Sequence, residues 1–288
     1  MHQFEIVTDS TCDLGLDWMA EHEVTMVPLS VFCGDEVFLD QIEISNEEYY
    51  DRMRTAKVLP HSSQPSPETF VDAFNKLAES GATQVLSVHI SEAGSGTGNS
   101  ARIAGGMVDG LDVTVYDTRE YTVAHGLLVA EAVKMRDKGA SVEETVAHLD
   151  KVRAAMRFYV LPDTLENLIK NGRLSKLAGG AISVLGIKLV IMMNDEGSLE
   201  AVYKVRGTKR SYAAVADDLE KAFPGHDRLT LSSLTVENAE GCHALVSQIE
   251  EAGFAVDDLG VTNAGPVIAT HAGFGMVALA AVPSALLA

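Results

Sequence analysis

The feature that most restricts the possible folds is an alternation of strand-like and helix-like segments over the first 157 residues. Short apolar runs are separated by segments whose apolar residues recur at helical spacing. Ser141 and Glu144 have capping-box spacing, and a long helix is expected from about Tyr121 to Lys138. The strand-like runs are FEIVTDS, VTMVPLSVF, TQVLSVHI and VTVYDT. This alternation predicts an α/β unit with a mostly parallel sheet and helices on both of its faces.

The pattern changes from about residue 158. The runs KLVIMM and LEAVYKVRG are joined by NDEG at 194–197, which predicts a hairpin. We therefore expect a second, α+β domain with a mixed or antiparallel sheet over 158–272, and a domain boundary near residue 157. The closing segment PVIATHAGFGMVALAA is interpreted as a strand, a glycine-rich loop and a helix. Residues 273–288 can pack back on the first domain, 1–157.

Charge and hydropathy limit the possible partners. The 288 residues include 22 Lys and Arg against 41 Asp and Glu, a formal charge of −19, which opposes binding to nucleic acid. The most apolar windows, 178–193 and 273–288, are interrupted by Lys188 and Pro283 and are shorter than the roughly 20 residues of a membrane span. No stable membrane insertion is expected. The N-terminal residues do not resemble an export signal, so a cytoplasmic location is expected.

Metal and disulfide chemistry are not expected from the cysteines and histidines. The three cysteines are widely spaced and form no CxxC pair, which argues against a disulfide framework and a structural zinc site. The nine histidines show no HxxxH or HExxH spacing. Each cysteine is interpreted as a small apolar residue of the core.

Three polar loops follow strand-like runs of the first half, at 8–11, 91–101 and 116–118. In a parallel sheet such loops share one rim, where ligands bind. The middle loop, SEAGSGTGNSA, combines glycines that allow close approach of a ligand with the hydroxyls of Ser95 and Thr97 just where a helix begins. It does not fit a dinucleotide or phosphate-loop motif, so nucleotide binding is unsupported. A tight strand-to-helix turn is the simpler interpretation of this loop alone.

The stretch HSSQPSPETF, at 61–70, places several hydroxyls and an amide directly before a helix start. Ser66 is a good N-cap, and Pro67 suits the first helical position. Ser62, Ser63 and Gln64 are either loop residues with no further role or donors of an anion site at the helix N-terminus, where free N–H groups and the helix dipole favour negative charge. Both interpretations remain open from these residues alone.

Six motifs occur in order from Thr8 to about Gly275: TDSTCDL, SSQPSPETF, SGTGNSA, LENLIKNGRLS, KVRGTKR and THAGFG. In this order they resemble the successive signatures of the DegV family, which includes the fatty-acid-binding subunits of bacterial fatty acid kinase. The resemblance implies a two-domain α/β protein that holds one long-chain fatty acid between its domains. It implies a non-catalytic lipid-binding subunit without a cofactor, which presents the carboxylate to a separate ATP-dependent kinase for acyl-phosphate formation and phospholipid synthesis.

The resemblance also implies which residues of this chain hold the ligand. Apolar parts of 158–169 and 181–193 are expected to cover the acyl chain. Arg206 and Arg173 are expected to serve the kinase partner or the transferred phosphate. The residues expected at the carboxylate are Ser62, Ser63, Ser95, Gly96, Thr97 and His271.

The chain departs from the family pattern at four positions. Ser62 stands where Thr is usual, and Gly94 stands where Leu is usual before the SGT sequence. Leu189 and Phe274 each stand where Pro is common. These departures leave the preferred length and saturation of the acyl chain open.

Two other functions are compatible with the same residues. An acyl hydrolase or transferase would use Ser95 and His271, and it requires the two side chains within hydrogen-bond reach and a third group that orients the imidazole. A carrier of another amphipathic carboxylate, such as a sterol-like or isoprenoid acid, would need a similar pocket.

Overall fold

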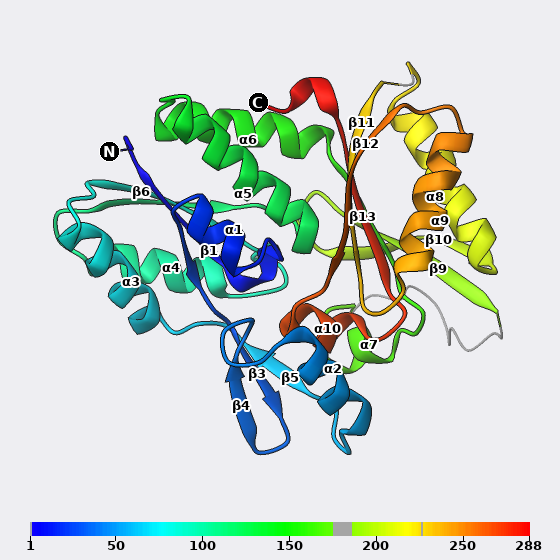
Figure 1. Ribbon diagram of the computed structural model, residues 1–288, viewed down its shortest axis with the longest axis horizontal. Helices are drawn as coiled ribbons and strands as arrows, with labels where there is room; N and C mark the ends of the chain where they lie inside the picture. The colour runs from blue at the N-terminus through cyan, green and yellow to red at the C-terminus, as the bar shows by residue number, and fades with distance from the viewer. Residues whose placement is uncertain (1, 175–185, 226) are drawn as a thin grey trace.

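The computed structural model describes residues 2–174, 186–225 and 227–288 (Figure 1). The first half contains a fully parallel four-stranded sheet in the order β2-β1-β6-β7. Its strands are β1 (Glu5–Asp9), β2 (Val24–Val27), β6 (Gln84–His89) and β7 (Asp112–Asp117). Helices α3 (Pro67–Glu79) and α4 (Thr97–Gly105) pack on one face, and α1 (Leu16–Glu21) and α5 (Thr122–Asp137) pack on the other. The predicted parallel α/β architecture is confirmed.

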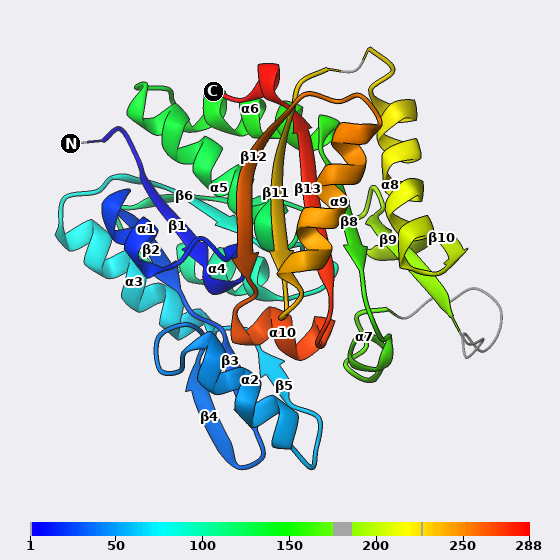
Figure 2. The same cartoon turned by 45° about the vertical axis from the view of Figure 1, so that its right-hand side comes forward.

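The second half contains a six-stranded mixed sheet in the order β10-β9-β8-β13-β11-β12. All neighbouring pairs are antiparallel except β11 and β12, which are parallel. Helices α8 (Thr208–Ala222) and α9 (Ala239–Glu251) cover its outer face (Figure 2). The predicted hairpin is present, with its turn at 194–198. The strands are β8 (Arg157–Leu161), β9 (Ile187–Met193), β10 (Leu199–Arg206), β11 (Leu229–Thr235), β12 (Val256–Asn263) and β13 (Val277–Pro283).

The interpretation of the closing segment as strand, loop and helix is wrong in both element types. Residues Pro266–Ala272 form helix α10, which begins with a proline at its first turn, and the apolar run after the glycine loop is strand β13. Strand β13 pairs with β8 on one side and β11 on the other, and all seven of its residues are buried. A strand buried on both faces lacks the polar alternation that distinguishes a strand from a buried helix. The division into domains near residue 157 remains our proposal, and β8 begins at Arg157.

A small three-stranded antiparallel sheet, in the order β4-β3-β5, extends from the first half. The run VTMVPLSVF, expected as one strand, is broken at Pro28 into β2 and β3, because proline has no N–H group for a sheet ladder. Strand β3 then turns at Gly34, which has a φ of 66°, into β4. The strands are β3 (Ser30–Cys33), β4 (Glu36–Leu39) and β5 (His61–Ser63), and helix α2 (Asn46–Thr55) lies between β4 and β5 in the chain.

Helix α5 lies between the two large sheets (Figure 1). It matches the predicted span from about Tyr121 to Lys138, and 12 of its residues are buried. It approaches the short 3₁₀ turn η1 (Ser10–Cys12) so closely that a Cβ at Gly126 would lie 2.4 Å from the carbonyl oxygen of Cys12. Helix α6 (Val142–Ala155) packs against α5 and begins with the predicted capping box of Ser141 and Glu144. Within the described residues, no helix is long and apolar enough to cross a membrane.

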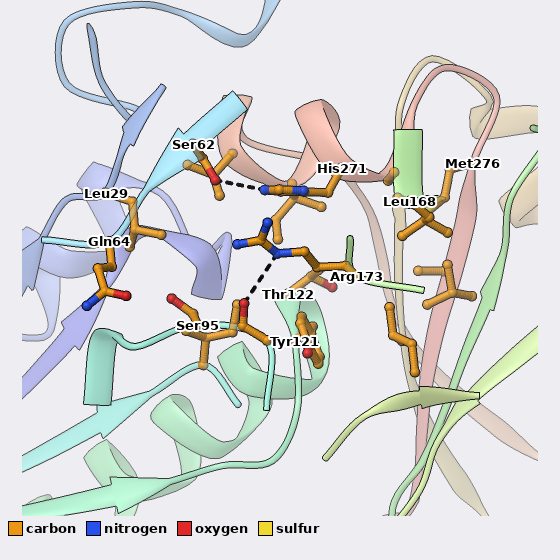
Figure 3. Close-up of a pocket in the computed structure, with 18 of the residues that line it drawn as sticks. Leu29, Ser62, Gln64, Ser95, Tyr121, Thr122, Leu168, Arg173, His271 and Met276 are labelled. Carbon is orange, nitrogen blue, oxygen red and sulfur yellow. Dashed lines mark hydrogen bonds between the residues drawn. The ribbon is translucent and has the colours of Figure 1, made fainter. Parts of the chain in front are cut away.

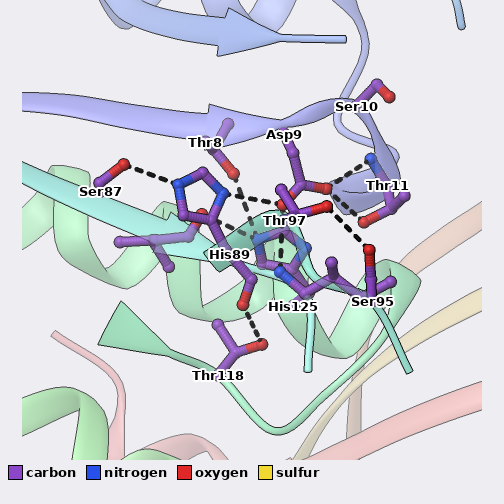
Figure 4. A network of polar contacts seen from close by, with 12 residues as sticks. Thr8, Asp9, Ser10, Thr11, Ser87, His89, Ser95, Thr97, Thr118 and His125 are labelled. Atoms are coloured by element: carbon purple, nitrogen blue, oxygen red, sulfur yellow. Dashed lines mark hydrogen bonds and ion pairs between the residues drawn. The ribbon is translucent and has the colours of Figure 1, made fainter. Parts of the chain in front are cut away.

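A buried carboxylate, Asp9, joins the ends of the two central strands of the parallel sheet (Figure 4). Asp9 Oδ2 accepts hydrogen bonds from the Ile90 backbone N–H at 3.1 Å and from His89 Nδ1 at 2.9 Å, and Oδ1 accepts from the Thr11 N–H at 3.1 Å. Burial alone would raise the pKa of Asp9. The nearby His125 and the hydrogen bond and charge of His89 outweigh it and lower the pKa to about 2.

We expect Asp9→Asn to destabilise the protein by about 2 to 4 kcal/mol, because the new amide group would face N–H donors instead of accepting from them. Urea unfolding at neutral pH measures the change. Asp72→Asn, an exposed position on α3, is the matched control and should lie within about 0.5 kcal/mol of the unchanged protein. Equal stability of the two variants would contradict the role given to Asp9.

The stability that Asp9 contributes decreases as the pH falls. Because the folded-state pKa of Asp9 is about 2, below the usual 3.8, its stabilisation is present above pH 3.8 and is lost as the pH falls towards 2. The Asn variant should lack this part of the acid destabilisation.

Candidate functional site

A cavity of about 330 Å³ lies between the loops of the parallel sheet, helix α10 and the inner face of the mixed sheet (Figure 3). Figure 3 shows Ser62, Ser95, Arg173 and His271 directed towards a common region, with Leu168 and Met276 farther along the cavity. The lining side chains with polar groups are Ser62, Gln64, Glu92, Ser95, Tyr121, Thr122, Arg173 and His271. The apolar lining side chains are Leu29, Ile90, Phe158, Val160, Leu168, Leu199, Val267, Ile268, Ala272, Met276 and Ala278.

The apolar cover expected from the second domain is present in part. Phe158, Val160 and Leu168 belong to the expected segment 158–169 and line the cavity. Residues 181–185 of the other expected segment lie outside the described residues, and 186–193 do not line the cavity. Leu199, on β10, lines it instead.

Strand β5 brings Ser62 to the polar end. Successive side chains of a strand point to opposite faces, so Ser62 faces the cavity while His61 and Ser63 face away from it. Ser62 Oγ lies 2.7 Å from Nε2 of His271 (Figure 3). Ser63 Oγ donates to the carbonyl oxygen of Gln64 at 3.2 Å and does not line the cavity. Ser66 caps helix α3 as predicted, since its Oγ accepts from the Thr69 N–H.

His271 lies near the C-terminus of α10 and is held neutral. Burial lowers the pKa of His271 to about 3, with a further contribution from the positive charge of Arg173. Its Nδ1 is buried and has no hydrogen-bond partner among the described residues. When Nε2 holds the single proton of the neutral imidazole, it donates to Ser62 Oγ and leaves the Ser62 hydroxyl free to donate to a ligand.

The SGT loop ends at the N-terminus of helix α4. Ser95 Oγ lies 2.8 Å from Thr97 Oγ1, and Thr97, the first helical residue, is buried behind Ser95 (Figure 4). The N-cap is Gly96, which lines the cavity and provides no side-chain cap. Gln64 covers this glycine so closely that a Cβ there would lie 2.2 Å from Gln64 Oε1. The helix N-terminus therefore supplies N–H groups and a positive dipole end beside the hydroxyl of Ser95.

The two arginines singled out from the sequence lie in different places. Arg173 lines the polar end of the cavity, where its Nε donates to the Gly94 carbonyl oxygen at 3.4 Å (Figure 3). Arg206 is exposed at the end of β10 and does not line the cavity. Both arginines are exposed, but Arg173 stands beside Ser62 and His271, whereas Arg206 lies outside the cavity (Figure 3).

Gly94 is one of the departures from the family pattern, and the structure gives its physical reason. A Cβ at Gly94 would lie 2.0 Å from the hydroxyl oxygen of Tyr121, so the tyrosine occupies the space of the usual leucine. Tyr121 lines the same cavity, and its hydroxyl donates to the Gly197 carbonyl oxygen at 3.5 Å. Leu189 and Phe274 do not line the cavity. Gly94 and Tyr121 thus contact each other closely in one wall of the pocket.

Two buried carboxylates that the sequence analysis missed position helix α10. Asp13 Oδ1 accepts from the Gly265 N–H at 2.8 Å, and Asp40 Oδ1 accepts from the Val267 N–H at 3.2 Å. Burial raises the pKa of Asp40 to about 7 and raises that of Asp13 well above its usual value. Asp13 follows the TDST loop in the sequence, but no local motif marks Asp40.

The hydrogen bonds of Ser95 and His271 do not support the acyl hydrolase interpretation. Ser95 Oγ bonds to Thr97 and His271 bonds to Ser62, so the pair required by the Ser95 hydrolase interpretation is not formed. Nothing orients the imidazole of His271 through Nδ1 in the described part of the chain. The described residues also contain no group of three or more His, Cys, Asp or Glu side chains that could hold a metal ion.

The fold and the cavity define a two-sheet α/β protein with an internal pocket that is polar at one end and apolar over the rest. The DegV family model, described as an uncharacterised protein family, matches residues 3–284. A DegV domain-containing protein of Halalkalibacterium halodurans is 33% identical, over 97% of this chain and 98% of that protein. The chain belongs to the DegV family.

Solved structures show the same fold. A DegV family protein of Thermus thermophilus, described for its fatty acid binding, has a TM-score of 0.88 and 32% identity, covering 98% of this chain and 100% of that one. A stearic-acid-binding protein of Eubacterium ventriosum has a TM-score of 0.87 and 29% identity, covering 97% and 98%. The family resemblance found in the sequence is confirmed.

We expect Gly94→Leu to destabilise the protein by about 1 to 3 kcal/mol, because the new side chain and Tyr121 cannot occupy the same space. The double variant Gly94→Leu with Tyr121→Ala should recover most of this loss. Thermal or urea unfolding of both single variants and the double variant measures the coupling. Additive effects of the two substitutions would contradict the proposed exchange of side chains.

Proposed function

We propose that this protein binds one long-chain fatty acid in the cavity, with the carboxylate at the polar end and the acyl chain along the apolar lining. The observation that supports this most directly is the distribution of the lining groups: hydroxyls, a neutral imidazole and an arginine at one end, and apolar side chains over the rest. The fatty acids bound by the proteins of Thermus thermophilus and Eubacterium ventriosum support the same ligand class.

The polar end suits a carboxylate. In our proposal its oxygens accept hydrogen bonds from Ser62, from Ser95 and from backbone N–H groups at Gly96 and Thr97, while His271 holds Ser62 in place. These groups lie at the start of α4, where the helix dipole favours a negative charge. Arg173, at the same end, supplies the positive charge that compensates a buried carboxylate or a phosphate attached to it.

The apolar part of the cavity supplies most of the binding free energy. Burial of some fifteen methylene groups at about 0.8 kcal/mol each gives about 12 kcal/mol before the cost of ordering the ligand. Such a ligand remains bound through purification. Its length and saturation are set by the shape of the lining, which includes Gly94 and Tyr121.

We further propose that the bound acid is the substrate of a separate ATP-dependent kinase that forms an acyl phosphate for phospholipid synthesis. The chain itself would act as the binding and presenting subunit, in the cytoplasm where ATP is available. Arg206 would meet the kinase, since it is exposed and lies outside the cavity. An exposed cation on a chain of net charge −19 is a distinct feature for a partner surface.

We expect an organic extract of freshly purified protein to contain one or a few fatty acids in near-stoichiometric amount. Mass spectrometry measures them, with an equal mass of an unrelated protein as the control. An empty extract together with no uptake of added oleate or palmitate would contradict the proposal. Recovery of a sterol-like or isoprenoid acid instead would favour a carrier of another carboxylate.

A titration of the lipid-free protein with oleate tests the carboxylate site. Ser62→Ala should weaken oleate binding by about 1 to 3 kcal/mol, because a buried acceptor loses its donor. Ser63→Ala is the matched control, since it removes the same hydroxyl from the neighbouring residue that faces away from the cavity. Equal effects of the two substitutions would show that the carboxylate does not lie at Ser62.

We expect Arg206→Glu to leave fatty-acid binding unchanged and to reduce kinase-dependent acyl-phosphate formation at least tenfold, because a repulsive charge replaces a partner contact. A reconstituted assay with a DegV-type kinase and ATP measures the product. Lys138→Glu, the same charge reversal at an exposed position beyond the end of α5, is the control. Undiminished product from Arg206→Glu would remove Arg206 from the interface.

A further inference from the structure

A second cavity, of about 530 Å³, adjoins the first at Phe158. Phe158 is buried and lines both cavities. The second cavity is formed between the loop after β7, the end of α6, the β9–β10 hairpin and α8. Its lining includes four cationic side chains: Arg119, Arg153, Arg157 and Lys221. The whole chain contains only 22 Lys and Arg, so this is a marked concentration of positive charge on an acidic protein.

Three of these four cations have no carboxylate partner within the described residues. Arg153 lies 3.6 Å from Asp150, but Arg119, Arg157 and Lys221 form no ion pair there. Arg157 lies over the ring of Phe223, and Arg119 donates to a backbone carbonyl oxygen of the hairpin. Unpaired cations gathered around one cavity in a chain of charge −19 give that cavity a local positive potential.

Asp195 and Asp218, which also line the cavity, form no ion pair with these cations within the described residues. Both carboxylate oxygens of Asp218 accept hydrogen bonds from tyrosine hydroxyls, at 2.8 Å from Tyr159 and 2.5 Å from Tyr203. Asp195 is exposed in the turn of the hairpin, and its backbone carbonyl oxygen accepts from Arg119.

A buried glutamate, Glu120, indicates a ligand in this cavity independently of the cations. Its side chain lines the cavity and is only 6% exposed, and its Oε2 has no hydrogen-bond partner among the described residues. Burial raises the pKa of Glu120 to about 8, although the charge of Arg153 opposes this, so the carboxyl group holds a proton at neutral pH. A buried carboxyl without a partner leaves one polar atom to be satisfied by a ligand.

We propose that this cavity is a second ligand site, which binds the phosphate group of a small phosphate-bearing molecule. Arginine guanidinium groups match phosphate oxygens in paired hydrogen bonds, and a phosphate offers enough oxygens to meet several cations at once. Glu120 completes the match, because its protonated carboxyl group can donate a hydrogen bond to a phosphate oxygen. A simple carboxylate has fewer oxygens with which to meet the cations and this carboxyl group together.

The site is separate from the fatty-acid cavity, and the inference does not rest on the fatty-acid assignment. The two cavities share the side chain of Phe158, but none of the four cations lines the first cavity. The lipid extract measures occupancy of the first cavity, and a titration with phosphate measures occupancy of the second. Each test can therefore fail without the other.

The test is a calorimetric titration of the purified protein with sodium phosphate and with sodium pyrophosphate, at matched ionic strength, with succinate as the carboxylate comparison. We expect saturable binding of a phosphate compound. The double variant Arg157→Gln with Lys221→Gln should weaken it at least about tenfold, because two charge-assisted contacts are lost. The control is Lys57→Gln with Lys138→Gln, which removes the same charge from exposed positions outside the cavity.

Each other outcome overturns the proposal. Absence of saturable binding to the unchanged protein would show that the cavity is no phosphate site. Equal weakening in the two double variants would assign the binding to overall charge. Succinate binding as tightly as phosphate would contradict the phosphate class. If the double variant with Arg157→Gln does not fold, phosphate titrations of the unchanged protein and of the single variant Lys221→Gln still test the site, because Lys221 is exposed.

Discussion

The buried carboxylate of Asp9 is the interaction on which the arrangement of the site depends. It accepts from the backbone N–H of Ile90 and the ring of His89, so the loop after β1 and the loop after β6 are held at one rim. The SGT loop follows directly from the second of these. Because a buried charge without its donors is costly, the rim cannot relax without unfolding. The positions of Ser95 and Gly96 therefore depend on Asp9 and His89, which do not line the cavity.

The other half of the polar end comes from far along the chain. His271 is 209 residues from Ser62, and it reaches that serine because Asp13 and Asp40 hold the N-terminus of α10 through backbone N–H groups. The first half of the chain thus supplies both one member of the pair and the anchors that position the other. A site assembled in this way depends on the packing of the two sheets as much as on its own residues.

Much of this could be predicted from the sequence, for identifiable reasons. The strand–helix alternation, the cap at Ser66 and the ordered motifs depend on local patterns, and they gave the parallel sheet and the family. The prediction assigned a strand to α10 and a helix to β13. Local sequence could not distinguish them, because a strand buried on both faces shows no alternation of apolar and polar residues. The prediction of one strand over 24–32 is wrong, although Pro28 marks the break between β2 and β3. The contact of Asp40 with helix α10 and the contact of Gly94 with Tyr121 arise only from tertiary packing, so no local pattern predicts them.

Helix α5 couples the unfolding of the two halves of the chain. It packs against strands of both large sheets, and one continuous apolar core contains residues from both halves of the chain, among them Leu86, Leu128 and Ala280. Each half also has a smaller apolar cluster of its own, but separation of the halves would expose the shared core to water. The two domains drawn from the chain order are then one cooperative unit in thermodynamic terms, and heating should melt them in a single transition.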